Sequence, residues 1–343
     1  MKRPVGILAV SFALLIACSL ASLFVGAVDI ALTDVADAWM WGNASSLKST
    51  ERTILYELRL PRMISGFLVG GALGVAGVGF QSLFRNPLAD PFIIGASSGA
   101  ALGVTVSIVM GLQISFVGLR SSGFAALAGS VLLVVIVLSI GSLSQRPGPT
   151  SLLLAGIALS SMVNSIVSLL MYWHDDKVVV IVAWLTGSLA GNNWSSVLTT
   201  SVLSLVGGFI IWSLSRPLDA YLLGDVASKS LGLELIRFRV LLVMGASIAT
   251  AAAVAAAGVI GFVGLIAPHI ARWIVGPKHA LLVPMSWCLG AILLILADSV
   301  ARTIIAPAEL PIGIVTALMG SPFFLGLLLF RPQRESGRIG VGA

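Results

Sequence analysis

Apolar residues run through this chain in long stretches, which are separated by short clusters of charge, proline and glycine. The stretches do not alternate polar and apolar residues, as the strands of a membrane barrel do. A stretch of about 20 apolar residues is long enough to cross roughly 30 Å of hydrocarbon as a helix. The pattern therefore predicts about ten transmembrane helices, at residues 5–28, 62–82, 92–112, 118–141, 151–172, 196–215, 238–258, 260–275, 281–299 and 312–330.

The composition supports an integral membrane protein. Of the 343 residues, 58% are apolar and only 10% are charged, whereas a soluble domain is about half apolar and a quarter charged. We expect an all-α polytopic protein with one transmembrane domain, residues 1–343. A cleaved signal peptide is the alternative for the N-terminal apolar run, but that run continues to Val28 and many spans follow, which favours a first membrane helix.

The distribution of charge predicts the orientation in the membrane. If the N-terminus is cytoplasmic, thirteen of the twenty Lys and Arg residues lie on the cytoplasmic side, against five of the fourteen acidic residues. Positive charge is enriched in cytoplasmic loops. Both termini and the loop after the sixth span are therefore predicted to be cytoplasmic, and the net charge of +6 gives no reason to expect nucleic-acid binding.

A weak internal repeat has an offset of 181 residues. It pairs Ala76-Gly77-Val78 with Ala257-Gly258-Val259, and Pro87 with Pro268. Because the second and seventh spans run in opposite directions, the two copies would have inverted topology, which is common in transporters.

Two helix faces carry residues at four-residue spacing. Gly66, Gly70 and Gly74 would let another helix approach the second span closely, so they predict packing. Ser160, Asn164 and Ser168 form a polar stripe along the fifth span. Polar side chains in hydrocarbon need a partner or water, so this stripe either bonds another helix or lines a translocation path.

The chain lacks the signature of a catalytic or metal site. His174 lies in a predicted external loop with two aspartates, but adjacent residues rarely converge on one metal ion. His269 follows Pro268 and is expected to be a hydrogen-bonding residue at a helix end. Asp298 and Arg302, one turn apart, are expected to pair. No P-loop, HExxH or GxSxG pattern is present, so we expect no enzyme activity, no metal and no cofactor on this chain.

Residues 58–100, "LRLPRMISGFLVGGALGVAGVGFQSLFRNPLADPFIIGASSGA", resemble the permease family of ABC importers for iron–siderophore complexes, haem and cobalamin, the type II importers. The resemblance continues through "LLGDVASKSLGL", "GFVGLIAPHIARWIVG" and "LADSVARTIIAPAELPIGIVTALMGSPFF" and covers nearly the whole chain. Residues 1–55 and 173–195 match weakly.

The resemblance implies that residues 219–234 form a cytoplasmic coupling loop, whose short helices dock on an ATPase subunit. Its apolar residues would pack on the ATPase, with Asp225, Ser228 and Lys229 as a polar rim. An ordinary amphipathic surface loop is the alternative. The implied coupling residues are Leu222, Leu223, Gly224, Asp225, Val226, Ala227, Ser228, Lys229, Leu231 and Gly232.

The family plan also implies partners and a function. Two permease copies, two ATPase subunits that bind ATP and Mg²⁺, and a periplasmic or lipid-anchored binding protein would form the importer in a bacterial or archaeal cytoplasmic membrane. Arg59, Arg62 and Arg302 match external arginines that receive acidic residues of the binding protein. The alternative is that Arg59 and Arg62 anchor the second helix at the headgroups. The cargo would be a ferric siderophore, haem or cobalamin. An ion-coupled secondary transporter is the rival function, but it needs an ionisable residue deep in a span.

Overall fold

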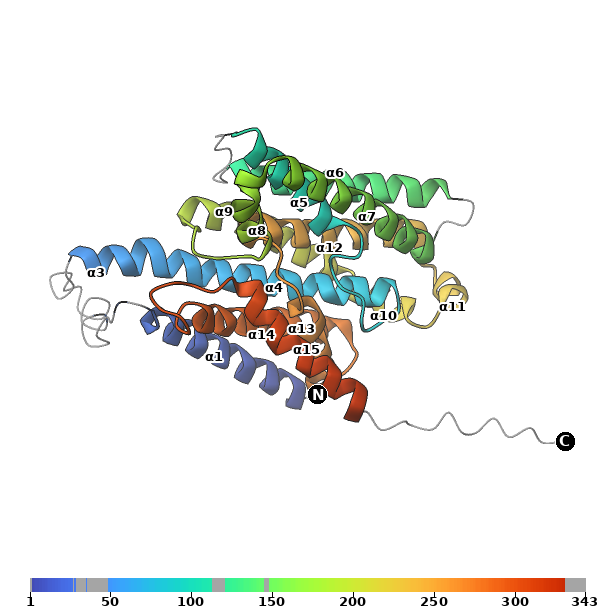
Figure 1. Ribbon diagram of the computed structural model, residues 1–343. Coiled ribbons are helices and arrows are strands. Elements are labelled where there is room, and N and C mark those ends of the chain that lie inside the picture. Colours follow the sequence, from blue (N-terminus) through green and yellow to red (C-terminus); the bar gives the residue numbers. More distant parts are fainter. Residues whose placement is uncertain are drawn as a thin grey trace.

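The fold is a bundle of helices in a computed structural model that describes residues 2–26, 28, 35, 49–112, 121–144 and 148–330 (Figure 1). The described residues form helices and no β-strand. Seven helices are long and apolar enough to cross a membrane, with α4 continuing from two shorter elements before it. These seven are α1 (Lys2–Phe24), α4 (Leu60–Leu83), α6 (Ser121–Leu143), α7 (Pro149–Trp173), α9 (Trp194–Ser213), α12 (Leu235–Ala257) and α14 (His279–Ala301).

Three further apolar helices are shorter than these seven, and they lie at three other predicted spans. They are α5 (Ala96–Val109), α13 (Val263–Val275) and α15 (Ile312–Phe330). Helices of 14 and 13 residues, as in α5 and α13, are only about 20 Å long. Each is preceded by an irregular segment, 84–95 and 258–262, and non-helical backbone is tolerated at membrane depth where it is buried in protein.

Short helices depart from the predicted loops. The second span begins earlier than predicted, because α3 (Ser49–Thr53) and the π-helix η1 (Ile54–Arg59) continue into α4. The segment expected to be an external loop at 173–195 contains η2 (Asp175–Lys177) and α8 (Val178–Leu185). Eight apolar residues are too few to register as a span, which explains why α8 was missed.

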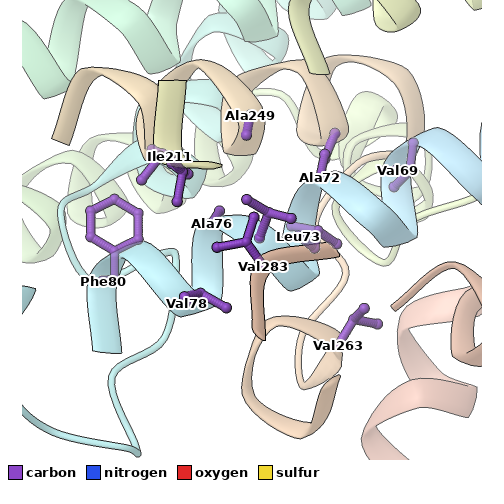
Figure 2. Close-up of a cluster of buried hydrophobic side chains, with 14 of the residues drawn as sticks. Val69, Ala72, Leu73, Ala76, Val78, Phe80, Ile211, Ala249, Val263 and Val283 are labelled. Carbon is purple, nitrogen blue, oxygen red and sulfur yellow. The ribbon is translucent and has the colours of Figure 1, made fainter. Parts of the chain in front are cut away.

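Helix α4 occupies the centre of the bundle. It packs against α9, α12, α13 and α14, and Figure 2 shows its apolar side chains lying among residues of these four helices. Small residues allow the close approach: a Cβ on Gly70 would lie 2.3 Å from the Gly290 carbonyl oxygen, and one on Gly77 would lie 1.9 Å from that of Gly264. The predicted packing role of the glycine face is confirmed, since Gly74 meets Ser286 in the same way.

An indole ring fills a notch between two helices of this core. A Cβ added to Gly71 of α4 would lie 2.3 Å from the Trp287 ring, and one added to Gly208 of α9 would lie 2.8 Å from it. Trp287 comes from α14 and also packs against Phe67, with ring centroids 5.9 Å apart. The two glycines therefore leave the space that this ring occupies.

Helices of the first half of the chain pack on helices of the second half, as an inverted repeat predicts. The 181-residue pairing, however, does not join matching places in two helices. Helix α4 packs on α13 and α14, and α12 packs on α5 and α6. Ala76-Gly77-Val78 lies inside α4, whereas Ala257-Gly258 ends α12. Gly95 and Phe262, the N-caps of α5 and α13, both have positive φ.

The expectation for His269 is wrong, because this residue lies inside α13 and not at a helix end. Pro268 is also within that helix. The His269 ring makes edge contacts with Trp273 and Phe323, at centroid distances of 4.8 and 6.1 Å. The side chain therefore packs among aromatic rings.

Candidate functional site

The predicted coupling segment folds into two short helices, α10 (Ser215–Tyr221) and α11 (Asp225–Ser230). Glycines bound α11, with φ of +105° at Gly224 and +82° at Gly232. Side chains other than glycine rarely adopt these angles, so the two residues set the sharp turns into and out of the helix. In Figure 1 this segment lies at the same end of the bundle as the start of α1 and the end of α15.

An apolar surface, here called the leucine patch, consists of Leu222, Leu223, Val226 and Leu231. Their exposed fractions are 44%, 67%, 82% and 65%. Lys229 is exposed beside them, and Ala227 is half-buried. Four large apolar side chains gathered on two turns of a charged segment are typical of a surface that binds another protein.

One predicted rim residue belongs to the interior. Ser228 is fully buried, and its hydroxyl donates hydrogen bonds to the carbonyl oxygens of Ala220, at 3.0 Å, and Gly224, at 2.6 Å. The placement of Ser228 in a polar rim is therefore wrong. Its hydroxyl ties α11 to α10 because the tight turn at Gly224 brings these carbonyl groups over the helix.

Asp225 is the centre of a cluster that we call the Asp225 clasp, formed with Arg85, Tyr221 and Arg239. One carboxylate oxygen accepts a hydrogen bond from Arg85 at 2.6 Å, and the other accepts one from Arg239 at 2.5 Å. Arg85 also donates to the Tyr221 carbonyl oxygen, and its guanidinium lies 4.2 Å from the centre of the Tyr221 ring. Burial alone would raise the pKa of Asp225, but the two arginines bring this pKa below its ordinary value.

A second cluster, the His279 clasp, consists of Asp219, His279 and Ser82. The Nδ1 atom of His279 lies 2.6 Å from an Asp219 carboxylate oxygen, and its Nε2 atom lies 2.9 Å from the Ser82 hydroxyl. The three residues come from α10, α14 and α4. The order of Asp, His and Ser resembles a catalytic triad, but Ser82 and His279 are only 3% and 1% exposed. The cluster therefore joins helices and offers no access to a substrate.

The three predicted docking arginines lie together at the other end of the bundle. Arg62 grips Asp298 through its Nε and one terminal nitrogen, at 3.0 and 2.8 Å, and Glu309 through both terminal nitrogens, at 2.7 and 2.9 Å. Arg302 pairs with Asp298 at 3.3 Å, so the predicted local pair is confirmed. Arg59 donates to the carbonyl oxygens of Leu23 and Val28, near the end of α1.

This arginine cluster has internal partners in the present conformation. Arg59 and Arg302 are each only 6% exposed. Glu309 is partly exposed, and the hydrogen bond from Arg62 lowers its pKa below the ordinary value of a glutamate. A carboxylate of a binding protein would have to compete with Asp298 and Glu309 for Arg62, and docking on these arginines stays a prediction.

The polar stripe lies on the outer part of the bundle. Helix α7 packs on α5 and α6, and Asn164 and Ser168 are exposed on its other side, while Ser160 is half-buried close to Gly95. Because they are exposed, Asn164 and Ser168 can face a path or a second copy.

In the part of the chain that is described, no three His, Cys, Asp or Glu side chains are grouped to hold a metal ion.

The sequence did not reveal the partners of these clusters. Arg85, Tyr221, Arg239, His279 and Glu309 were not singled out. The only signal was that two of them, Arg85 and Glu309, are charged residues next to apolar spans, inside the blocks "RNPLADP" and "ELPIG". In the first block, Asn86 and Asp90 each accept a hydrogen bond from the backbone NH two residues on, at 2.9 and 2.8 Å, which forms two successive turns before α5.

A family model described as the FecCD transport family matches residues 14–330, nearly the whole chain. The chain belongs to the FecCD transport family. It is therefore a transmembrane permease subunit of a binding-protein-dependent ABC importer, as the resemblance implied.

Curated members of this family and a solved structure show the same likeness. The chain is 38% identical to the cobalamin import system permease protein BtuC of Halobacterium salinarum, over 83% of this chain and 76% of the relative. It is 39% identical to the hemin transport system permease protein HmuU of Yersinia pestis, over 83% and 85%. A structure described as an inward-facing conformation of a metal-chelate type ABC transporter superposes with a TM-score of 0.82 and 33% identity, over 95% of this chain and 99% of that one.

Proposed function

We propose that this permease, paired with a second copy of itself, carries a metal chelate into the cytoplasm, and that a separate ATPase subunit drives it by binding the leucine patch. The chelate is a ferric siderophore, haem or cobalamin. Support for the cargo class comes from the relatives, two of which are named for cobalamin and haemin, and from the metal-chelate type of the similar structure.

The leucine patch is the observation on which the ATPase contact rests. Its side chains are exposed, but the residues beneath them, Ser228 and Tyr221, are buried and hydrogen-bonded. A firm base under an apolar surface is suited to a protein partner, because the surface does not have to be ordered on binding. Interfaces of this kind have an apolar centre and a polar rim, and Lys229 lies where a rim residue would.

The position of the leucine patch supports the orientation in the membrane. The patch lies at the end of the bundle where α1 starts and α15 ends (Figure 1), and the excess of Lys and Arg there favours the cytoplasm. The C-terminal residues 331–343, which contribute to that charge count, lie outside the described residues. The opposite end, with the arginine cluster, would receive the binding protein.

A second copy would cover α7 and α15. Both helices lie at the margin of the bundle and expose large apolar side chains such as Met162 and Leu318. Asn164 shares the exposed side of α7, and a polar amide on that surface is better placed beside a water-filled path between two copies than against lipid. Transport would then proceed by alternation between outward-open and inward-open arrangements, biased by nucleotide on the ATPase subunits.

The test of the ATPase contact replaces Leu223 with Asp. The charge would be buried in the subunit contact, where truncation of a central residue already costs about 2 kcal/mol or more. We expect Leu223→Asp to insert normally but to lose its ATPase during purification, whereas Leu223→Met keeps it. Normal co-purification of the Leu223→Asp permease with its ATPase would contradict the proposal.

A further inference from the structure

We propose that Asp225 is the residue through which movement of α11 is transmitted to α4 and α12, and that Arg85 and Arg239 are its two separate receivers. The proposal rests on the proposed function, since it assumes that an ATPase moves α11. It assigns a mechanical role to Arg85, the first residue of "RNPLADP".

The geometry divides one carboxylate between two membrane helices. Arg85 follows the end of α4, and Arg239 lies in the first turns of α12. Each binds a different oxygen of Asp225, at 2.6 and 2.5 Å. A displacement of Asp225 therefore pulls on both helices at the same time, along two different hydrogen bonds.

Both arginines are held firmly enough to pass on such a displacement. Arg85 has a φ of +49°, an uncommon conformation outside glycine, and its guanidinium stacks on the buried ring of Tyr221. The Tyr221 hydroxyl donates to the Leu83 carbonyl oxygen at 3.2 Å. Arg239 is within 5.5 Å of the same ring, so the tyrosine supports both receivers.

Helix α11 itself has little other attachment to the core. Ser228 is its only buried residue, and its apolar side chain Val226 faces outward in the leucine patch. Ser228 bonds this helix to α10 and the Gly224 turn, whereas Asp225 bonds it directly to Arg85 and Arg239. The adjoining His279 clasp joins α10 to Ser82 on the last turn of α4, so that turn is where the two connections meet.

Hydrogen exchange of the assembled permease and ATPase, with and without nucleotide, tests the proposal without a known cargo. In the wild-type complex we expect nucleotide to change exchange in 225–230, 84–95 and 235–239. Asp225→Asn should keep the change in 225–230 and lose the other two. Arg85→Gln should lose the change in 84–95 alone, and Arg239→Gln that in 235–239 alone. Arg237→Gln, which removes an exposed arginine from the first turns of α12, is the matched control and should behave as wild type.

Three results would overturn the proposal. The first is unchanged transmission in Asp225→Asn. The second is loss of the change in the Arg237→Gln control as well. The third is fast exchange of 225–230 in Asp225→Asn before nucleotide is added, which would assign Asp225 a purely structural role. Failure of the proposed function is distinct from these, because the wild-type permease would then fail to retain an ATPase or show no nucleotide-dependent change in 225–230.

Discussion

Helices α4 and α7 are both long and apolar, yet they occupy opposite environments. The most apolar part of the helix that ends in α4 is 83% buried within the chain, and that of α7 is 22% buried. Hydropathy does not separate them, because hydrocarbon and protein interior are equally apolar surroundings. What separates them is the size of the side chains: α4 presents glycines on several sides, whereas α7 presents Ile157, Met162 and Tyr172 to its surroundings.

The difference shows how this bundle is organised. The central helix holds its neighbours by backbone contact, so its surface has no space for change. The marginal helix contacts two neighbours and leaves its remaining surface for lipid or for another chain. Tight packing therefore belongs to the central helix, and sparse packing belongs to the helix at the margin.

The largest effect is expected from a valine placed in α4, and a valine placed in α7 is the comparison. Gly77→Val in α4 would force side-chain atoms into the Gly264 backbone and should destabilise the protein by about 3 kcal/mol. Ala158→Val, on the exposed side of α7, should change stability by no more than about 0.5 kcal/mol. Thermal unfolding of the two purified variants in the same detergent measures both, and similar losses would show that α7 is as tightly packed as α4.

Cysteine labelling sharpens the comparison with a smaller perturbation. In a background without Cys18 and Cys288, Asn164→Cys and Ser168→Cys in α7 should react with a membrane-impermeant maleimide, at rates that change when nucleotide binds the assembled transporter. Ser65→Cys in α4 is 1% exposed at the native serine and should stay unreactive. If Asn164→Cys and Ser168→Cys are inert in every state while flanking positions react, the polar stripe is a contact between helices.

The smallest effect concerns the outer ends of the two helices. Helix α4 is bonded there to the 302–311 loop through Arg62 and Glu309, whereas His174 caps α7 within its own last turn. Because the folded pKa of Glu309 is lowered, its contribution is present above the ordinary glutamate pKa and is lost as pH falls through the folded value. Glu309→Gln should cost at most about 1 kcal/mol at neutral pH, and its difference from wild type should vanish in acid. Glu57→Gln, which replaces an exposed glutamate before the same helix, is the control for loss of a surface carboxylate.

The sequence was sufficient to predict an all-helical membrane protein with several spans, because the spans are long apolar runs bounded by charge or proline. It also predicted the glycine face of α4, since a four-residue spacing maps directly onto one side of a helix. It could not place α8, which is too short, or the register of the repeat. Equivalence between the halves depends on where helices begin, and similar residues can recur elsewhere by chance.

The candidate site was predictable only in its local parts. The two glycines and the leucines of the coupling segment are recognisable because they are close in sequence. The bonds that fix the segment join residues far apart, as with Arg85 and Asp225, and no pattern within one helix reports such a pair. Ser228 was misplaced for a related reason: its hydroxyl is buried because the chain turns at Gly224, and a linear pattern does not contain that turn.

The notch filled by Trp287 ties three positions on three helices to one another. A methyl group on either Gly71 or Gly208 would enter the ring, and a smaller ring would leave a void in its place. Each single change is therefore disfavoured, although a coordinated exchange of ring and glycines could preserve the volume. Over evolutionary time we expect these three sites to change together, because replacing any one of them alone would pass through a less stable intermediate.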